Sequence, residues 1–361
     1  DWFRHGHHSD KAYDSVILHV VSEADTEITR TNGEQIPQLL LTCPENVRLH
    51  YHELCVADQY PACHPILASL PKLTIHSWLT ALQTERLEQK ARLITQRLAL
   101  CNRNWEDAFF ITLARNFGFG LNGDAFETWA GLLPFRALDK HRNDLFQIEA
   151  FFYGLAGLLE ETFLKKEQED EYSLRLCKEF RYLQRKFEIG QGMDATLWRF
   201  LRLRPENFPH IRLAQLAYLY QKGDKLFSRL LEAETLADVR TLLDARTSPY
   251  WENHYLFGRP SSQKEKTMGE RSKDLIIINT VVPFLYTYGL HKADERMCER
   301  AGRFLEELKA ESNHIIRSWS DAGLPVVSAA DSQALIQLQK EYCDKRKCLY
   351  CRFGYEYLKH T

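Results

Sequence analysis

The sequence predicts an α+β fold, with a small amino-terminal β-rich portion packed on a large, irregular all-helical domain. Short β-branched apolar runs occupy the first 75 residues, and apolar residues after that point recur with the helical period of 3.6. Three of the nine cysteines fall within nine residues near the carboxy terminus. We therefore expect a β-rich portion over 1–75, a helical domain over 76–330, and a terminal helix with a cysteine-bearing tail over 331–361.

The composition is that of a folded globular protein. With 361 residues, 44% of them hydrophobic, the chain can bury a sizeable core, and the formal net charge of −2 argues against a generic nucleic-acid coat. No run reaches the roughly 18 to 20 apolar residues of a membrane-spanning helix, and no signal-peptide pattern is present. We expect a cytoplasmic protein with reduced thiols and no membrane partner. Because the chain opens on Asp1 in mid-pattern, we also expect sequence upstream of it.

The β-rich portion is predicted from two apolar runs and a turn. Val16–Val21 is nearly continuous in aliphatic residues, which is typical of a strand covered on both faces. Asn32-Gly33 is a strong two-residue hairpin signal, and Gln38–Thr42 forms the second apolar run. The pattern predicts strand, Asn-Gly turn and strand over 16–42.

The helical domain is predicted from apolar stripes and from residues that start or stop helices. Asn143 is a plausible N-cap, and Pro209 occupies the first-turn position that proline prefers. The expected helices cover about 76–98, 105–117, 124–133, 143–164, 174–187, 209–219, 226–233, 236–245, 274–288, 293–308 and 333–342.

The amino-terminal segment is the first candidate site, since it places Asp1, His5, His7, Asp10 and His19 within twenty residues. Imidazoles and carboxylates together can bind a divalent metal or supply an acid and a base. Nucleases of the restriction-endonuclease-like class hold Mg²⁺ with acidic residues on adjacent strands, although their Glu-x-Lys is absent here. The alternative is a polar surface turn with a hydrogen-bonded strand histidine.

The carboxy-terminal cysteines are the second candidate site. Cys343, Cys348 and Cys351 form a C-x4-C-x2-C arrangement whose short spacing lets thiolates converge on a metal, zinc ahead of an iron–sulfur cluster. The fourth ligand is left open between Cys298, His314, His360 and a residue from elsewhere. Such a site would be structural. The alternative is a set of reduced cysteines packing a terminal helix.

Three further residues are candidates for substrate binding. Arg204 and Arg212 flank a helix start that suits an anion such as phosphate, and His254 lies in an aromatic segment that suits stacking on a base or sugar. A polar, basic loop with Lys264 and Lys266 adds two possible phosphate contacts. Arginines satisfying loop carbonyls, and a hydrogen-bonded core corner, explain the same residues without a ligand.

Several segments resemble a known family. Asp1-Trp2…His5-Gly-His7, Ala114-Arg-Asn-Phe-Gly118, Arg204-Pro-Glu-Asn-Phe-Pro209, Ile278-Asn-Thr-Val-Val-Pro283 and the cysteine tail are similar to the DUF2851 family of bacterial proteins of unknown function. The resemblance implies an upstream strand bearing a Gly-x-x-Glu-x-His-like sequence. It implies no activity, substrate or catalytic residue.

Two functions of different classes follow from these patterns. The first is a metal-dependent hydrolase, nuclease-like, that uses the amino-terminal histidines and aspartates, with nucleic acid as the implied partner. The alternative is a non-catalytic binding or scaffold protein with a structural metal site at its carboxy-terminal cysteines.

Overall fold

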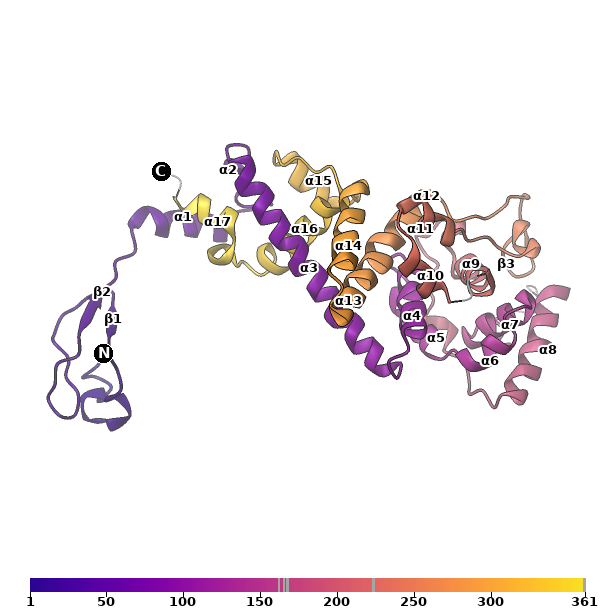
Figure 1. Ribbon diagram of the computed structural model, residues 1–361, viewed down its shortest axis with the longest axis horizontal. Coiled ribbons are helices and arrows are strands. Elements are labelled where there is room, and N and C mark those ends of the chain that lie inside the picture. The colour runs from indigo at the N-terminus through magenta and orange to yellow at the C-terminus, as the bar shows by residue number, and fades with distance from the viewer. Residues whose placement is uncertain (162, 165, 167–168, 223–224, 360–361) are drawn as a thin grey trace. The chain divides into compact units, whose positions relative to one another are not determined.

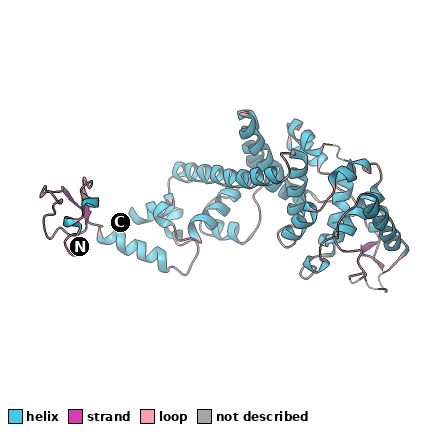
Figure 2. Ribbon diagram, turned by 90° about the horizontal axis from the view of Figure 1, so that it is seen from below, coloured by secondary structure: helices cyan, strands magenta, loops and turns pink. Residues whose placement is uncertain are grey.

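Helices dominate the fold. The computed structural model describes residues 1–161, 163–164, 166, 169–222 and 225–359. Helices account for 61% of the residues and strands for 4%. Figure 2 shows many helices and a few short strands. The helical part of the prediction is therefore confirmed, and the α+β class is wrong. The predicted β-rich portion forms few backbone ladders because most of its residues lie in turns, 3₁₀ helices and loops.

The chain divides into two compact units. Unit 1 comprises Asp1–Trp78, His314–Pro325 and Leu338–Thr361, and unit 2 comprises Leu79–Asn313 and Val326–Gln337. Helix α3 (Lys72–Leu100) contributes its first residues to unit 1 and the remainder to unit 2. Among the described residues, no helix is long and apolar enough to cross a membrane.

The first forty residues of unit 1 hold one short sheet. Strands β1 (His19–Val21) and β2 (Gln38–Leu40) pair in parallel, with His19 opposite Gln38, so the predicted hairpin between them is wrong. The Asn-Gly turn does form locally. Gly33 has φ 82°, and the turn closes a single antiparallel bridge between Thr29 and Gln35.

The strand near residue 16 is not covered on both faces, as its apolar run had predicted. Val20, Leu39 and Leu40 of the strands are exposed, as are the flanking residues Ile17, Leu18 and Leu41. Burial here is confined to a small cluster of Trp2, Ile28 and Ile36. The Arg30 side chain ties the loops together by donating to the Asp14 and Val16 carbonyls at 2.9 and 2.8 Å.

The remainder of unit 1 brings the two ends of the sequence together. Helix α1 (Glu45–Val56) packs on α17 (Arg352–Lys359), as Figure 1 shows, and the Tyr357 hydroxyl donates to Glu53 at 3.0 Å. Helix α2 (His64–Leu67) also packs on α17. Ser318 on α15 (His314–Asp321) donates to the Tyr60 carbonyl at 2.7 Å, which holds the 57–63 loop.

Unit 2 is a helical domain around one extended apolar core. Its elements, besides most of α3, are α4 (Trp105–Phe117), α5 (Gly123–Gly131), α6 (Phe135–Lys140), α7 (Leu145–Leu155), α8 (Glu171–Lys186), α9 (Pro209–Lys222), α10 (Leu226–Glu232), α11 (Leu236–Leu242), β3 (His254–Leu256), β4 (Arg259–Pro260), α12 (Glu270–Ile276), α13 (Val282–Lys292), α14 (Glu295–Glu307) and α16 (Ala329–Leu338).

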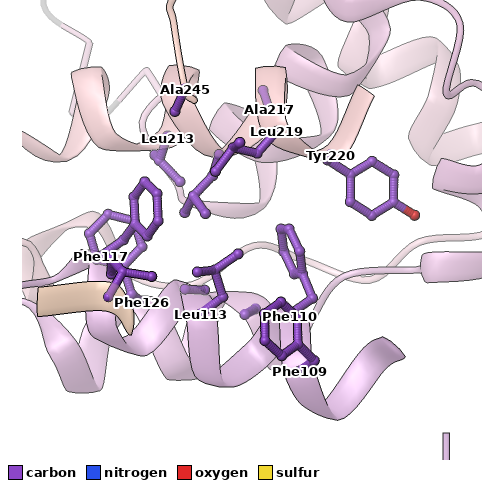
Figure 3. Packing of buried hydrophobic residues seen from close by; sticks show 14 of the residues in the cluster. Phe109, Phe110, Leu113, Phe117, Phe126, Leu213, Ala217, Leu219, Tyr220 and Ala245 are labelled. Carbon is purple, nitrogen blue, oxygen red and sulfur yellow. The ribbon is translucent and has the colours of Figure 1, made fainter. Parts of the chain in front are cut away.

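The core of unit 2 is built from facing helix stripes. Phe110 and Leu113 of α4 face Leu213 and Leu219 of α9 (Figure 3), and all four are buried. Helix α4 has the predicted bounds because Asn104 caps its first turn, accepting from the Glu106 and Asp107 amides. The 143–164 prediction is wrong in its cap, since Asp144 rather than Asn143 accepts from the first-turn amides of α7.

Two helices contain a π-turn. The π segment Ile277–Val281 joins α12 to α13, and a second, Gln339–Cys343, follows α16. A π-turn leaves some backbone carbonyls without their helical hydrogen bonds. In unit 2 a side chain supplies a donor instead: Asn116 donates to the Asn279 carbonyl at 3.0 Å and to the Thr280 hydroxyl at 2.8 Å. The second π-turn ends at Cys343 and so belongs to the candidate site.

Candidate metal centre

Four cysteines of unit 1 line one cavity. Cys63, Cys343, Cys348 and Cys351 line a small cavity of about 30 Å³. The remaining wall is mostly apolar, with Leu54, Ala62 and Trp319 among its residues, and Arg346 is a cation at its edge. All four are free thiols. Three of them are the predicted tail cysteines, and the fourth comes from the other end of the chain.

Each of the four thiols is placed by a different local structure. Cys63 immediately precedes α2, and Cys343 ends the second π-turn. Cys348 begins a 3₁₀ turn, Cys348–Tyr350, and Cys351 lies between that turn and α17. A contact between Tyr60 and the tail, in which the hydroxyl donates to the Cys343 carbonyl at 3.4 Å, supports the approach of Cys63.

Gly354 allows the cysteine turn to pack on α17. A Cβ at this position would overlap the carbonyl group of Cys348. Only a residue without a side chain lets the backbone of the 348–351 turn come this close to the first turn of α17. Gly354 therefore determines how near the 348–351 turn lies to α17.

The thiols influence one another electrostatically. Burial raises the pKa of the Cys63 thiol well above its usual range, and the neighbouring Cys351 and Cys348 raise that pKa further. Burial likewise raises the pKa of Cys343, with added contributions from Cys63, Cys351 and Cys348. Such mutual effects require close groups, and they oppose the presence of several bare thiolates. A bound cation would remove that opposition.

Cys351 is surrounded by N–H donors. Burial raises the pKa of its thiol, while the backbone amides of Gly354 and Phe353 and the side chain of Trp78 lower it. The indole N–H of Trp78 is buried and has no oxygen or nitrogen acceptor among the described residues. N–H groups directed at a sulfur stabilise the thiolate form, as the second shell of a metal site does.

The geometry differs from that of a single-ion site. Zinc–sulfur bonds of about 2.3 Å hold tetrahedral thiolates about 3.8 Å apart. Within the ranges that the structure describes, no three histidine, cysteine, aspartate or glutamate side chains are arranged to hold one metal ion.

Two of the other residues that the sequence suggested as a fourth ligand lie elsewhere. Cys298 belongs to unit 2, where its thiol donates to the Tyr286 carbonyl at 3.7 Å. His314 is exposed at the start of α15. His360 lies outside the described residues. Cys63 was missed because nothing near it in the sequence has metal-ligand spacing.

The amino-terminal segment gathers its histidines around aromatic rings. Trp2 is buried, and its ring lies 5.5 Å from that of His7 and 5.4 Å from that of His19. The His7 ring also lies 4.0 Å from Tyr13 and 5.8 Å from His5, with which it stacks. The structure thus brings His5, His7 and His19 into one aromatic cluster.

The two aspartates of this segment make contacts outside that cluster. Asp10 caps the short turn that follows it, accepting from the Ala12 amide at 2.9 Å. Asp1 is exposed, and its carbonyl accepts from the His5 amide at 3.0 Å. The carboxylates expected to complete a metal or acid–base site are thus placed for backbone capping and for solvent.

The predicted substrate-binding residues of unit 2 have structural partners. Arg212 is buried, donates to Gln215 at 2.8 Å and to Asn207 at 2.5 Å, and lies 4.4 Å from the Phe119 ring. His254 stacks on Tyr250 at 4.1 Å, and its Nδ1 contacts the Tyr250 carbonyl at 2.9 Å. Arg204 is exposed at the start of the 205–207 turn.

The loop lysines are likewise engaged. Lys266 is buried and donates to the carbonyls of Trp251 and Glu252, the latter at 2.8 Å. Lys264 pairs with Glu206. Lys266 is therefore held by structural contacts, whereas Arg204 and Lys264 are exposed.

A cationic pocket in unit 2 was not foreseen from the sequence. A pocket of about 510 Å³ beside α3 is lined by Arg86, Lys90, Arg97 and Arg115, and Glu127 is the one carboxylate among its lining residues. Glu127 is paired with both Arg97 and Arg115. Arg86, Lys90 and Arg97 lie along α3, and Arg115 comes from α4, so the pocket forms only when the two helices pack.

A buried carboxylate in unit 2 was also missed. Glu149 on α7 is fully buried and accepts hydrogen bonds from Tyr172 and from Ser248, the latter at 3.2 Å. Burial raises its pKa to about 7, although these donors oppose the shift. The sequence places Glu149 on an apolar helical stripe, where a carboxylate is unexpected, and that position was the available clue.

Comparison with known proteins identifies a family. Residues 1–314 match the family described as "Protein of unknown function (DUF2851)", and the chain belongs to it. Neither a curated protein nor a solved structure matches the chain. Cys63 lies within the matched region, whereas the three tail cysteines lie beyond it.

Proposed function

We propose that this member of the DUF2851 family is a binding or scaffold protein whose unit 1 is held together by a metal cofactor on four thiolates. One observation carries the proposal: Cys63, Cys343, Cys348 and Cys351 converge on a single cavity from opposite ends of the chain. A cofactor there would join the 57–63 loop to the tail, as structural metal sites join segments that lack a large core.

The hydrolase hypothesis has weaker support. His5, His7 and His19 pack around Trp2 and Tyr13, and Asp10 caps a turn. The amino-terminal segment remains a predicted site, and its role is tested below.

Elemental analysis of the purified protein tests the proposal. We expect a transition metal bound to the wild-type chain and lost from the Cys63→Ala variant. Cys43→Ala is the matched control, because Cys43 is exposed in the same unit and does not line the cavity. A folded wild-type protein without metal, or a Cys63→Ala variant with full metal content, would contradict the proposal.

Anion binding by unit 2 is a second candidate function. It is supported by the pocket beside α3, where four cations face one carboxylate. A cationic pocket of this size suits a phosphate-bearing ligand, and nucleic acid is the partner that the sequence had suggested.

Fluorescence anisotropy with a labelled single-stranded oligonucleotide tests this second function. We expect binding at low salt that weakens as salt rises, and a marked loss in Arg86→Glu. Arg92→Glu is the matched control, since it makes the same charge change on α3 at a residue that does not line this pocket. Equal losses in both variants would show general charge attraction rather than use of the pocket.

A further inference from the structure

A second pocket of unit 2 lies between α4, α6 and the last turn of α9. Its volume is about 620 Å³, and all of its lining residues belong to unit 2. Small-molecule sites have volumes in this range and combine apolar rings with a few placed polar groups. The pocket shares no lining residue with the cysteine cavity or with the cationic pocket beside α3, so it is a separate candidate site.

One wall of this pocket is aromatic. Phe110 of α4, Phe135 of α6 and Tyr220 of α9 line it, and the Phe110 ring meets the other two edge-on at 5.8 and 5.3 Å. Figure 3 shows Phe110 and Tyr220 on facing helices, with the Tyr220 hydroxyl directed away from the apolar core. Such a wall suits an apolar ligand body, and the faces of its rings attract a cation.

Two charged residues of the pocket neutralise each other. Asp139 of α6 pairs with Arg142 at 2.5 Å and accepts from the Tyr220 hydroxyl at 2.7 Å. Arg142 also donates to the Tyr220 carbonyl at 2.8 Å and lies 4.4 Å from the centre of the Tyr220 ring. The Arg142 guanidinium is thus engaged by the protein itself.

Two further charged residues lie at the start of α10. The Glu106 carboxylate accepts from the Phe227 and Ser228 amides at 3.0 and 2.9 Å. These amides belong to the first turn of α10, where they have no partner within the helix, so Glu106 satisfies them. Lys225 immediately precedes α10 and is exposed to solvent.

Asp107 differs from these residues. It lines the pocket half-buried in the first turn of α4, and no lysine or arginine of the described ranges forms an ion pair with it. Burial and then the negative charges of Asp139 and Glu106 raise the pKa of the Asp107 carboxyl to about 6, against a hydrogen bond with Asn104. A cation beside this carboxylate would offset both its burial and the repulsion from its neighbours.

We propose that this pocket binds a small organic ammonium ion with an apolar body. The ammonium group lies at the Asp107 carboxylate, and the apolar body lies against the aromatic wall. Partly desolvated carboxylates and ring faces together recognise alkylammonium groups. An anion of the same shape would meet three carboxylates, those of Asp107, Asp139 and Glu106.

The experiment is a ligand-detected NMR titration of the whole chain with three probes of similar shape. Phenethylamine is a cation, 2-phenylethanol is neutral, and 3-phenylpropionate is an anion. We expect phenethylamine to bind at least about tenfold more tightly than the other two, because hydrogen bonds between charged groups are stronger than neutral ones. Equal affinity for phenethylamine and either other probe would overturn the proposal.

Asp107→Asn tests the residue assigned to the ammonium group. It keeps the shape of the side chain, and phenethylamine should bind at least about tenfold more weakly to it. Glu295→Gln is the matched control, since it removes an exposed first-turn carboxylate from α14 that does not line this pocket. Wild-type affinity in Asp107→Asn would contradict the assignment. If this variant does not fold, the three probes on the wild-type chain decide alone.

The pH dependence of binding is a second measurement. With a pKa of about 6, Asp107 is ionised at pH 8 and mostly protonated at pH 5, so phenethylamine should bind about tenfold more weakly at pH 5. The other titratable groups near Asp107 or in the pocket are Cys101, Glu106, Asp139, Arg142, Tyr220 and Lys225. The dependence should disappear in Asp107→Asn. A variant that keeps it would assign the titration to another of these groups and would overturn the role of Asp107.

Discussion

The amino-terminal histidines and the carboxy-terminal cysteines of unit 1 looked alike as sequence patterns and differ as structures. His7 and His19 make edge-on ring contacts with Trp2. The cysteines instead line a small cavity together. Close spacing in sequence therefore did not distinguish a packed cluster from a site, whereas the space between the side chains does.

The difference also lies in what satisfies the groups. The histidine rings in edge-on contact with Trp2 and tilted against Tyr13 gain packing energy without a ligand, although the Nδ1 of His19 is buried without a hydrogen-bond partner. Buried thiols that raise one another's pKa gain little from their present neighbours, because a thiol is a weak hydrogen-bond partner. A ligand is expected where buried groups lack compensation.

The largest predicted effect is the loss of the cofactor. In Cys63→Ala, or after a chelator has removed the metal, the free energy of unfolding of unit 1 should fall by about 4 kcal/mol or more, since structural metal sites contribute on the order of 10 kcal/mol to folding. Hydrogen exchange read by mass spectrometry should show faster exchange in α17 (Arg352–Lys359) and unchanged exchange in α4 of unit 2. Unchanged protection in α17 would remove the contrast between the two clusters.

A buried carboxylate extends the comparison to unit 2. The pKa of Glu149 rises from 4.5 to about 7 on folding, so the folded chain holds a proton that the unfolded chain has lost over that interval. Its contribution to stability is fully present below pH 4.5 and is lost as the pH rises to about 7, amounting to about 3 kcal/mol.

Glu149→Gln should abolish this loss of stability with rising pH. Urea unfolding of unit 2 at pH 5 and pH 8 measures it, with Glu299→Gln, an exposed glutamate on α14, as the matched control. We expect the control to keep the wild-type dependence on pH. An identical pH dependence in Glu149→Gln and wild type would place the titrating group elsewhere.

Gly354 tests the geometry of the cysteine cluster without removing a ligand. Gly354→Ala would push its Cβ into the Cys348 carbonyl and should cost about 1 to 3 kcal/mol, with reduced metal content. Gly302→Ala is the matched control, because a Cβ at that helical position meets nothing within 4 Å and should be neutral or slightly stabilising. Equal metal content in both variants would show that the 348–351 turn tolerates displacement.

Elements that depend on interactions between residues close in sequence were predicted correctly, and pairings between distant residues were not. Helix α4 was predicted with its bounds because its apolar stripe and its Asn104 cap are local. The pairing of β1 with β2 was wrong because parallel register depends on a partner strand and not on the Asn32-Gly33 turn. Local patterns determine elements, while pairing is decided between them.

The candidate site shows the same distinction between local and distant residues. Cys343, Cys348 and Cys351 were found because their spacing is short, but Cys63 reaches them only through folding. Tyr60, three residues before it, contacts Cys343 across a separation of 283 residues. The amino-terminal histidines were overvalued for the same reason, since their proximity in sequence said nothing about the rings of Trp2 and Tyr13 that occupy their surroundings.

The smallest predicted effect concerns His7, and it is the one that can reverse the comparison. His7→Ala removes ring contacts with Tyr13 and Trp2 and should cost about 0.5 to 1.5 kcal/mol of local stability. Metal content should stay at the wild-type level, as in the exposed neighbour variant His5→Ala. Titration of both variants with manganese or zinc, followed by isothermal calorimetry, measures this. A metal-binding event present in wild type and Cys63→Ala but lost in His7→Ala would make the amino-terminal segment a second metal site. The hydrolase hypothesis would then be supported despite the packing of the histidines around Trp2.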